Sequence, residues 1–166
     1  PKTKTTQLIK SNIHKVKNLL NYSRVILNSD FQIEFSHHYG IENFPKVGAT
    51  IINCINRAYC KKIVIQTAGQ SHPFHYHKKK EETFQIIWGE LKVKLDKKIK
   101  KLYPGDILLV QTGVWHSFST KEGCVFEEIS TTHFNDDSFY NDPVIKSKSR
   151  SERKTIVENW GRFQLK

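Results

Sequence analysis

The sequence contains no methionine, only three cysteines and no long apolar run. A helix that crosses a bilayer needs about 20 apolar residues in succession, and the polar start, residues 1–6, lacks the apolar segment of a signal peptide. We therefore expect a cytoplasmic protein without a membrane partner. Cys54, Cys60 and Cys124 are odd in number and lack the spacing of a zinc site, which predicts reduced thiols and no disulfide framework. The start at Pro1 leaves open whether the chain is free-standing or a module of a longer polypeptide.

Acidic residues are also scarce, with 16 against 27 basic ones and a formal net charge of +11. Such an excess attracts anionic partners over long range. Much of it follows a simple pattern, because Lys92 and Lys94 alternate with apolar residues and further lysines follow a turn at Asp96. That alternation is typical of a strand with one face in water, which argues against a nucleic-acid surface. We expect no nucleic-acid partner, and a preference for an acidic or phosphorylated small molecule over a neutral one.

Periodicity predicts secondary structure at both ends of the chain. Residues 31–35 alternate as in a strand, and residues 49–54 and 61–66 predict an adjacent pair of strands. Residues 151–160 predict a short closing helix. Between positions 6 and 28 apolar residues recur with helical spacing, which predicts one or two N-terminal helices. The residues with this spacing are Leu8, Ile9, Ile13, Val16, Leu19 and Leu20.

These patterns divide the chain into three parts. Residues 1–47 are expected to form an extension of helix and strand, residues 48–145 a β-barrel, and residues 146–166 a C-terminal tail. Within the barrel, residues 107–110 are expected to be a buried run that follows a turn at residues 104–106. A hydrophobic content of 37% and ten phenylalanines indicate a globular chain with a real core.

Four side chains in the middle of the sequence are suitable ligands of a divalent metal. His75 and His77 are two apart, so on a strand they point to the same face. Glu82 opens the next β-rich segment and returns a carboxylate beside the pair. His116 follows the break at Gly113 on a later strand. The alternative is that these histidines are hydrogen-bonded core groups without a metal.

The other histidines have no such pattern. His72 lies among the same residues but fits no ligand position, so it is expected at the surface or in support of the ligands. The default for the remaining four is an ordinary exposed or hydrogen-bonded side chain. They are His14, His37, His38 and His133.

The sequence resembles the two signature motifs of the cupin family. The residues that carry the resemblance are Gly69, His75, His77, Glu82 and Gly89, then Pro104, Gly105, Asp106, Gly113 and His116. It implies an all-β fold, the cupin double-stranded β-helix or jelly-roll barrel, here with N-terminal helices and a short C-terminal helix. It also implies that His75, His77, Glu82 and His116 bind a divalent metal, manganese first, with zinc, iron and nickel as alternatives. Gln111 and Thr120 replace the usual proline and asparagine of the second motif, at turn and packing positions.

A narrower resemblance concerns two titratable residues. Lys80-x-Glu82-Thr83-Phe84 and Glu128-Ile129-Ser130-Thr131 resemble segments of the D-lyxose ketol-isomerase family of cupins, although a loop that this family often inserts before the lysine is missing. The resemblance implies an aldose-ketose isomerase acting through a cis-enediol, with Lys80 and Glu128 as the acid and base pair. Family members often form homodimers through edge strands, which implies the same here.

The residues themselves leave both roles open. Glu128 shares a strand face with Phe126 and Ser130, so it points into the barrel if that face is internal. Glu127 looks the other way and is expected at the surface, paired with a lysine. Lys80 closes a run of three lysines that could equally be an exposed turn.

Rival functions belong to other classes. The same segments resemble the cupin module at the C-terminus of some sialic-acid-synthase-like proteins, which implies a non-catalytic domain that binds an acidic sugar. The acid and base candidates favour an enzyme over such a module. An iron-dependent dioxygenase ranks third. A nucleic-acid regulator ranks last, because the sequence has no helix-turn-helix and no platform of paired aromatic residues.

Overall fold

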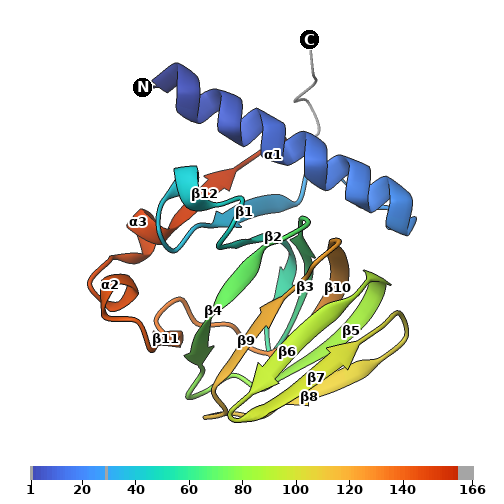
Figure 1. Ribbon diagram of the computed structural model, residues 1–166, viewed down its shortest axis with the longest axis vertical. Helices are drawn as coiled ribbons and strands as arrows, with labels where there is room; N and C mark the ends of the chain where they lie inside the picture. The colour runs from blue at the N-terminus through green and yellow to red at the C-terminus, as the bar shows by residue number, and fades with distance from the viewer. Residues whose placement is uncertain (1, 29, 161–166) are drawn as a thin grey trace.

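The computed structural model describes residues 2–28 and 30–160 and contains two antiparallel sheets (Figure 1). The seven-stranded sheet has the order β12-β1-β2-β3-β10-β5-β8 and the five-stranded sheet the order β11-β4-β9-β6-β7. The first six strands are β1 (Gln32–Ser36), β2 (Ala49–Asn56), β3 (Tyr59–Gln66), β4 (Ser71–Tyr76), β5 (Glu82–Gly89) and β6 (Leu91–Leu95). The others are β7 (Lys98–Leu102), β8 (Ile107–Val110), β9 (His116–Ser119), β10 (Cys124–Thr131), β11 (Phe139–Tyr140) and β12 (Lys154–Val157). The helices are α1 (Lys2–Ser23), the 3-10 turn η1 (Ile41–Asn43), α2 (Pro143–Lys146) and α3 (Arg150–Arg153).

The two sheets face each other across an apolar core, as in a jelly-roll barrel. Phe84 of β5 and Phe126 of β10 contribute from the larger sheet, and Leu91, Val93 and Phe118 from the smaller one. Each of these strands also turns alternate residues away from the core, because successive side chains on a strand point to opposite faces. Lys92 and Lys94 lie exposed on the outer face of β6, so the predicted solvated face is confirmed.

A second core lies outside the barrel, where α1 crosses the larger sheet (Figure 1). Ile13, Val16 and Leu20 of α1 are buried there, against Ile33 of β1 and Ile52 of β2 among others. The spacing of three and four residues places these side chains on one face of the helix. The N-terminal helix predicted from that spacing is confirmed.

The structure corrects two expectations. Residues 107–110 are not a buried run, because Ile107 is 63% exposed and Leu109 is 50% exposed. Their strand, β8, is an edge of the larger sheet, and only its inward residues, Leu108 and Val110, are covered.

The helix predicted for residues 151–160 is too long. Small C-terminal helices are present, but α3 ends at Arg153 and Lys154–Val157 form strand β12. This strand pairs antiparallel with β1 and extends the larger sheet. Thr155, Ile156 and Val157 are β-branched and favour an extended backbone once an unpaired strand edge is available.

Two further expectations concern membranes and thiols. Within the described residues, no helix has both the length and the hydropathy needed to cross a bilayer. Cys54, Cys60 and Cys124 are free thiols, as their number and spacing predict.

We predict that Gly89→Ala destabilises the protein more than Gly105→Ala. Both glycines have positive φ angles, +81° and +94°, which cost an L-residue about 1–2 kcal/mol. At Gly105 a Cβ atom would meet nothing within 4 Å, whereas at Gly89 it would lie 2.0 Å from the carbonyl oxygen of Gly123. Urea unfolding of both variants measures the difference. Equal losses in the free energy of unfolding would contradict a backbone contact at Gly89.

Candidate functional site

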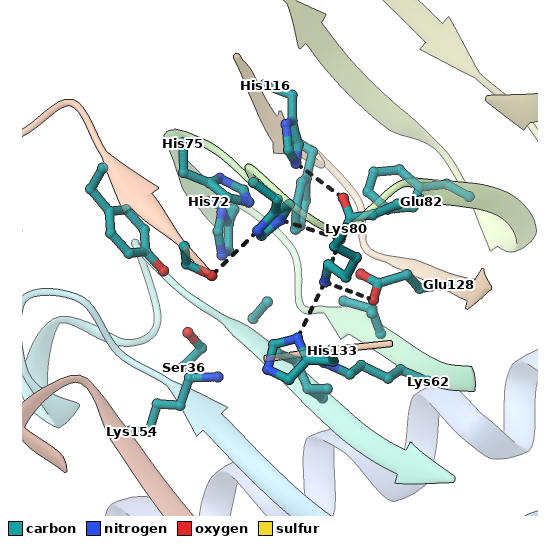
Figure 2. A pocket seen from close by; sticks show the side chains of 18 residues that line it. Ser36, Lys62, His72, His75, Lys80, Glu82, His116, Glu128, His133 and Lys154 are labelled. Atoms are coloured by element: carbon teal, nitrogen blue, oxygen red, sulfur yellow. Dashed lines mark hydrogen bonds and ion pairs between the residues drawn. The ribbon is translucent and has the colours of Figure 1, made fainter. Parts of the chain in front are cut away.

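The sheets bring three of the predicted ligands together inside the barrel. His75 on β4 and His116 on β9 are direct partners in the antiparallel register, and His77 follows the end of β4. All three are buried, and one ligand atom from each lies within 4.8 Å of the others. Figure 2 shows His75 and His116 at one end of the cavity. The two-residue spacing and the later strand therefore place these imidazoles as predicted.

Backbone carbonyl groups fix the orientation of each imidazole. The Nδ1 atoms of His75, His77 and His116 lie 2.9, 2.7 and 2.9 Å from the carbonyl oxygens of Pro73, Asp137 and Val114. A carbonyl oxygen can only accept, so each Nδ1 carries a proton, and in the neutral form of the ring Nε2 then keeps its lone pair. Burial holds the pKa of His75 well below its usual range. Such neutral, oriented imidazoles are the form that metal ligands require.

Glu82, the first residue of β5, faces two of these histidines. Its carboxylate oxygens lie 3.3 Å from Nε2 of His77 and 3.2 Å from Nε2 of His116. Among the described side chains, Glu82 Oε2 and His116 Nε2 are buried polar atoms without a hydrogen-bond partner. Neither a carboxylate nor an unprotonated Nε2 can donate a hydrogen bond. The short distance between Glu82 Oε2 and His116 Nε2 is therefore favourable when a cation binds between them, and the donor set fits a divalent metal.

Lys80 is buried beside the same carboxylate. Its ammonium nitrogen lies 2.6 Å from Glu82 Oε1 and 3.4 Å from Glu128 Oε2. Burial would lower the pKa of Lys80, but the charges of Glu128 and Glu82 outweigh it and raise the pKa above its usual range. Burial would likewise raise the pKa of Glu82, but the charge of Lys80 outweighs it and holds the pKa well below its usual range. The exposed-turn interpretation of Lys80 is wrong, since its exposed fraction is 4%.

Asp137 explains why Lys80 turns inward while Lys78 and Lys79 stay exposed. Its carboxylate accepts hydrogen bonds from the backbone N–H groups of Lys78, Lys79 and Lys80, with N–O distances of 2.9–3.1 Å. Its carbonyl oxygen accepts the bond from His77 Nδ1. One buried residue thus fixes a candidate ligand and the lysine three positions later. The sequence carries no local signal for this, because Asp137 is nearly 60 positions away.

Glu128 projects from β10 into the barrel, on the same face as Phe126 and Ser130. It is 8% exposed and lies in the cavity with the histidines. Its neighbour Glu127 turns outward and pairs with Lys61 at 3.5 Å, as predicted for a surface carboxylate. The period of two along β10 therefore separates a buried carboxylate from an ordinary one.

Two of the remaining histidines also line the cavity. The ring of His72 stacks on Phe118 and lies 4.6 Å from that of His75, so His72 supports the cluster and is not at the surface. Burial lowers the pKa of His72 to about 3. His133, for which no partner was visible in the sequence, has Nδ1 3.4 Å from the Lys80 ammonium nitrogen.

Other residues of the site were missed by sequence reasoning. Lys62 of β3 and Lys154 of β12 line the cavity, and Glu34 of β1 lies buried beside Lys154. Glu34 was recognised only as part of an alternating strand. The burial of these charges follows from the pairing of β12 with β1 and of β3 with β10, which no local pattern reveals.

Comparisons with known proteins agree with this description. The cupin domain family matches residues 62–127. The L-ribose isomerase of Cellulomonas parahominis is similar in structure, with a TM-score of 0.68 and 14% identity, over 85% of this chain and 94% of that one. For an Acinetobacter sp. DL28 L-ribose isomerase mutant bound to L-ribose, the TM-score is 0.69 and the identity 12%, over 89% and 94% of the chains.

A shorter match is with the cupin domain of Schizosaccharomyces pombe Cnp3. It covers 51% of this chain and 65% of that one, with 17% identity and a TM-score of 0.48. No curated protein matches the chain in sequence. The domain match, the two sheets and the three-histidine cluster point to the same family, and a cluster of this kind indicates a site for a divalent metal. Residues 62–127 thus match the cupin domain family, and the chain has the cupin fold.

Proposed function

We propose that this protein is a metal-dependent sugar isomerase that interconverts an aldose and a ketose through a cis-enediol, as in the D-lyxose ketol-isomerase family. The observation that carries the proposal is the buried ammonium group of Lys80, which lies between Glu82 at the histidine cluster and Glu128. Such a proton transfer requires a metal site with an acid and a base next to it. The similarity to two L-ribose isomerases over most of the chain supports the same reaction class, although at 12–14% identity it concerns the fold.

His75, His77, His116 and Glu82 would hold the metal. Three nitrogen donors and one carboxylate suit several divalent ions, and we propose manganese, with iron, nickel and zinc as alternatives. When bound, the ion supplies a Lewis acid for the carbonyl and adjacent hydroxyl oxygens of the sugar. The tautomers set by Pro73 and the neighbouring carbonyl groups prepare this site before any ion arrives.

The chain's own groups would then move the proton. Glu128, which lies 3.4 Å from the Lys80 ammonium nitrogen, takes the proton from the carbon next to the sugar carbonyl. Lys80 helps to return a proton to the neighbouring carbon of the enediol, and its charge stabilises the developing negative charge. Asp137 keeps Lys80 in place through the backbone of the preceding turn. Burial of both groups excludes water from the reacting carbon.

The second candidate is a sugar-binding cupin without chemistry, like the module of sialic-acid-synthase-like proteins. The observation in its favour is the ion pair of 2.6 Å between Lys80 and Glu82, which engages a candidate ligand. Incubation of the metal-loaded protein with a panel of aldoses, followed by detection of ketoses, separates the two functions. Ketose formation supports the isomerase, whereas saturable binding of N-acetylneuraminate without any turnover supports the binding module.

We predict that Glu128→Gln lowers turnover by about 10²- to 10⁴-fold, because the variant lacks a general base. Its metal content stays unchanged, since Glu128 is not a candidate ligand. The matched control is Glu127→Gln, one residue away on the outer face of the same strand, which should keep full activity. Unchanged turnover in Glu128→Gln would remove this residue from the mechanism.

We also predict that His77→Ala empties the metal site. The variant loses one of three clustered imidazoles and the Nε2 atom that faces Glu82. Elemental analysis of the purified protein measures the metal content per chain. His72→Phe is the control, because His72 is also buried and touches His75 but is not in the cluster. Normal occupancy in His77→Ala would refute the ligand assignment.

A further inference from the structure

Two largely covered lysines, Lys62 and Lys154, line the cavity and have no part in the proposed mechanism. Lys62 is 5% exposed and the side chain of Lys154 is 12% exposed. In Figure 2 both side chains, together with Ser36 and His133, lie across the cavity from His75 and His116. A buried ammonium group is costly unless an anion or several hydrogen-bond acceptors compensate for its lost water. The partners of the two lysines are therefore informative.

Lys154 has its counter-ion within the chain. Its nitrogen lies 2.8 Å from Glu34 Oε2, and Arg150 holds the other oxygen of the same carboxylate at 3.1 Å. Asn53 donates a further hydrogen bond to Glu34. Burial would raise the pKa of Glu34, but the charge of Lys154 outweighs it and lowers the pKa. Glu34 is thus fully engaged by these three neighbours.

Lys62 has no equivalent partner. Within residues 2–28 and 30–160 its ammonium group forms neither a hydrogen bond nor an ion pair, although it faces the cavity. Burial and the charge of Lys80 lower the pKa of Lys62, and the charges of Glu128 and Glu34, neither of which is within ion-pair distance, do not outweigh them. Its strand neighbour across the sheet is Glu128, so Lys62 lies beside the candidate base.

The charges of the residues that line the cavity also leave one cation without a counter-ion. Three lysines (Lys62, Lys80 and Lys154) and two carboxylates (Glu82 and Glu128) line the cavity, which leaves one positive charge in excess among the lining residues. A divalent ion at the histidine cluster would increase the excess. A neutral sugar would leave this excess uncompensated, whereas a ligand with one anionic group would supply the missing counter-ion.

We infer that the cavity binds an anionic sugar, a sugar phosphate or a sugar acid, whose charged group contacts Lys62 at the end opposite the histidine cluster. The inference rests on the proposed function, because a sugar held by its carbonyl end at the metal would direct its far end toward Lys62. Ser36 and His133 line this end of the cavity and offer hydrogen bonds to the same group.

Isothermal calorimetry on the metal-loaded protein tests this inference with three probes: D-ribose, D-ribose 5-phosphate and D-glucuronate. We expect at least one anionic probe to bind at least about tenfold more tightly than D-ribose. This gain in affinity is typical of a charge-assisted hydrogen bond. Preference for the phosphate identifies a phosphate ester, and preference for glucuronate identifies a sugar acid. Equal affinity for all three probes would overturn the inference without any variant.

The variants assign the preference to Lys62 and separate it from an attraction to the metal. Lys62→Met and Lys62→Gln should lose the preference at unchanged metal content, whereas Lys62→Arg keeps it. Lys61→Gln is the matched control, because this neighbouring lysine faces outward and pairs with Glu127. A preference that survives both neutral substitutions would contradict the role of Lys62. Binding is measured without turnover, so the two proposals can fail separately. A protein that prefers the anionic probes but shows no turnover refutes only the proposed isomerase function. A protein that turns over sugars without this preference refutes only the present inference.

Discussion

The ion pairs of Lys80 hold the two halves of the site together. One ammonium group lies between Glu82, which faces the histidines, and Glu128, which comes from a different strand. Burial of a single charge without its partner is unfavourable by several kcal/mol, and removal of one member of a buried pair costs about 3–5 kcal/mol. Lys80 therefore makes it possible for two carboxylates to lie in a cavity that is also lined by Phe84 and other core residues. The turn that carries Lys80 must be rigid for this, and Asp137 makes it so.

Lys80 and a metal at the histidine cluster would both interact with Glu82. At 2.6 Å from Lys80, Glu82 is engaged as a counter-ion, while its other oxygen faces His116 with no hydrogen-bond partner among the described residues. A metal at the histidine cluster would share this carboxylate with the ammonium group. Each cation would then weaken the hold of the other on Glu82, because like charges in a low-dielectric cavity repel strongly. A lysine released in part from Glu82 would be free to act on a ligand, so in the proposed function metal binding and the acid role of Lys80 would be coupled through one side chain.

The strand periodicity made most of the fold and part of the site predictable. The two-residue spacing of His75 and His77 and the inward face of Glu128 follow from the pleat of a strand, which is a local property. The roles of Asp137, Lys62 and Lys154 were not accessible in this way. Lys154 reaches Glu34 across 120 residues, and only the pairing of β12 with β1 brings them together. The same pairing explains why the C-terminal helix is shorter than predicted. Secondary-structure propensity alone cannot reveal that the edge strand of a sheet is unpaired and available to a further strand.

The positive charge of this protein acts at two distances. Exposed lysines such as Lys92 and Lys94 belong to an outer face, where salt screens their field beyond about 8 Å at physiological ionic strength. They raise the rate at which an anion arrives but do not choose among anions. Lys62 is shielded from that screening by burial and can only be reached by a ligand that enters the cavity. The net charge of +11 thus acts on the rate of association, whereas at the proposed anion site the unpaired lysine would set the affinity and identity of the bound ligand.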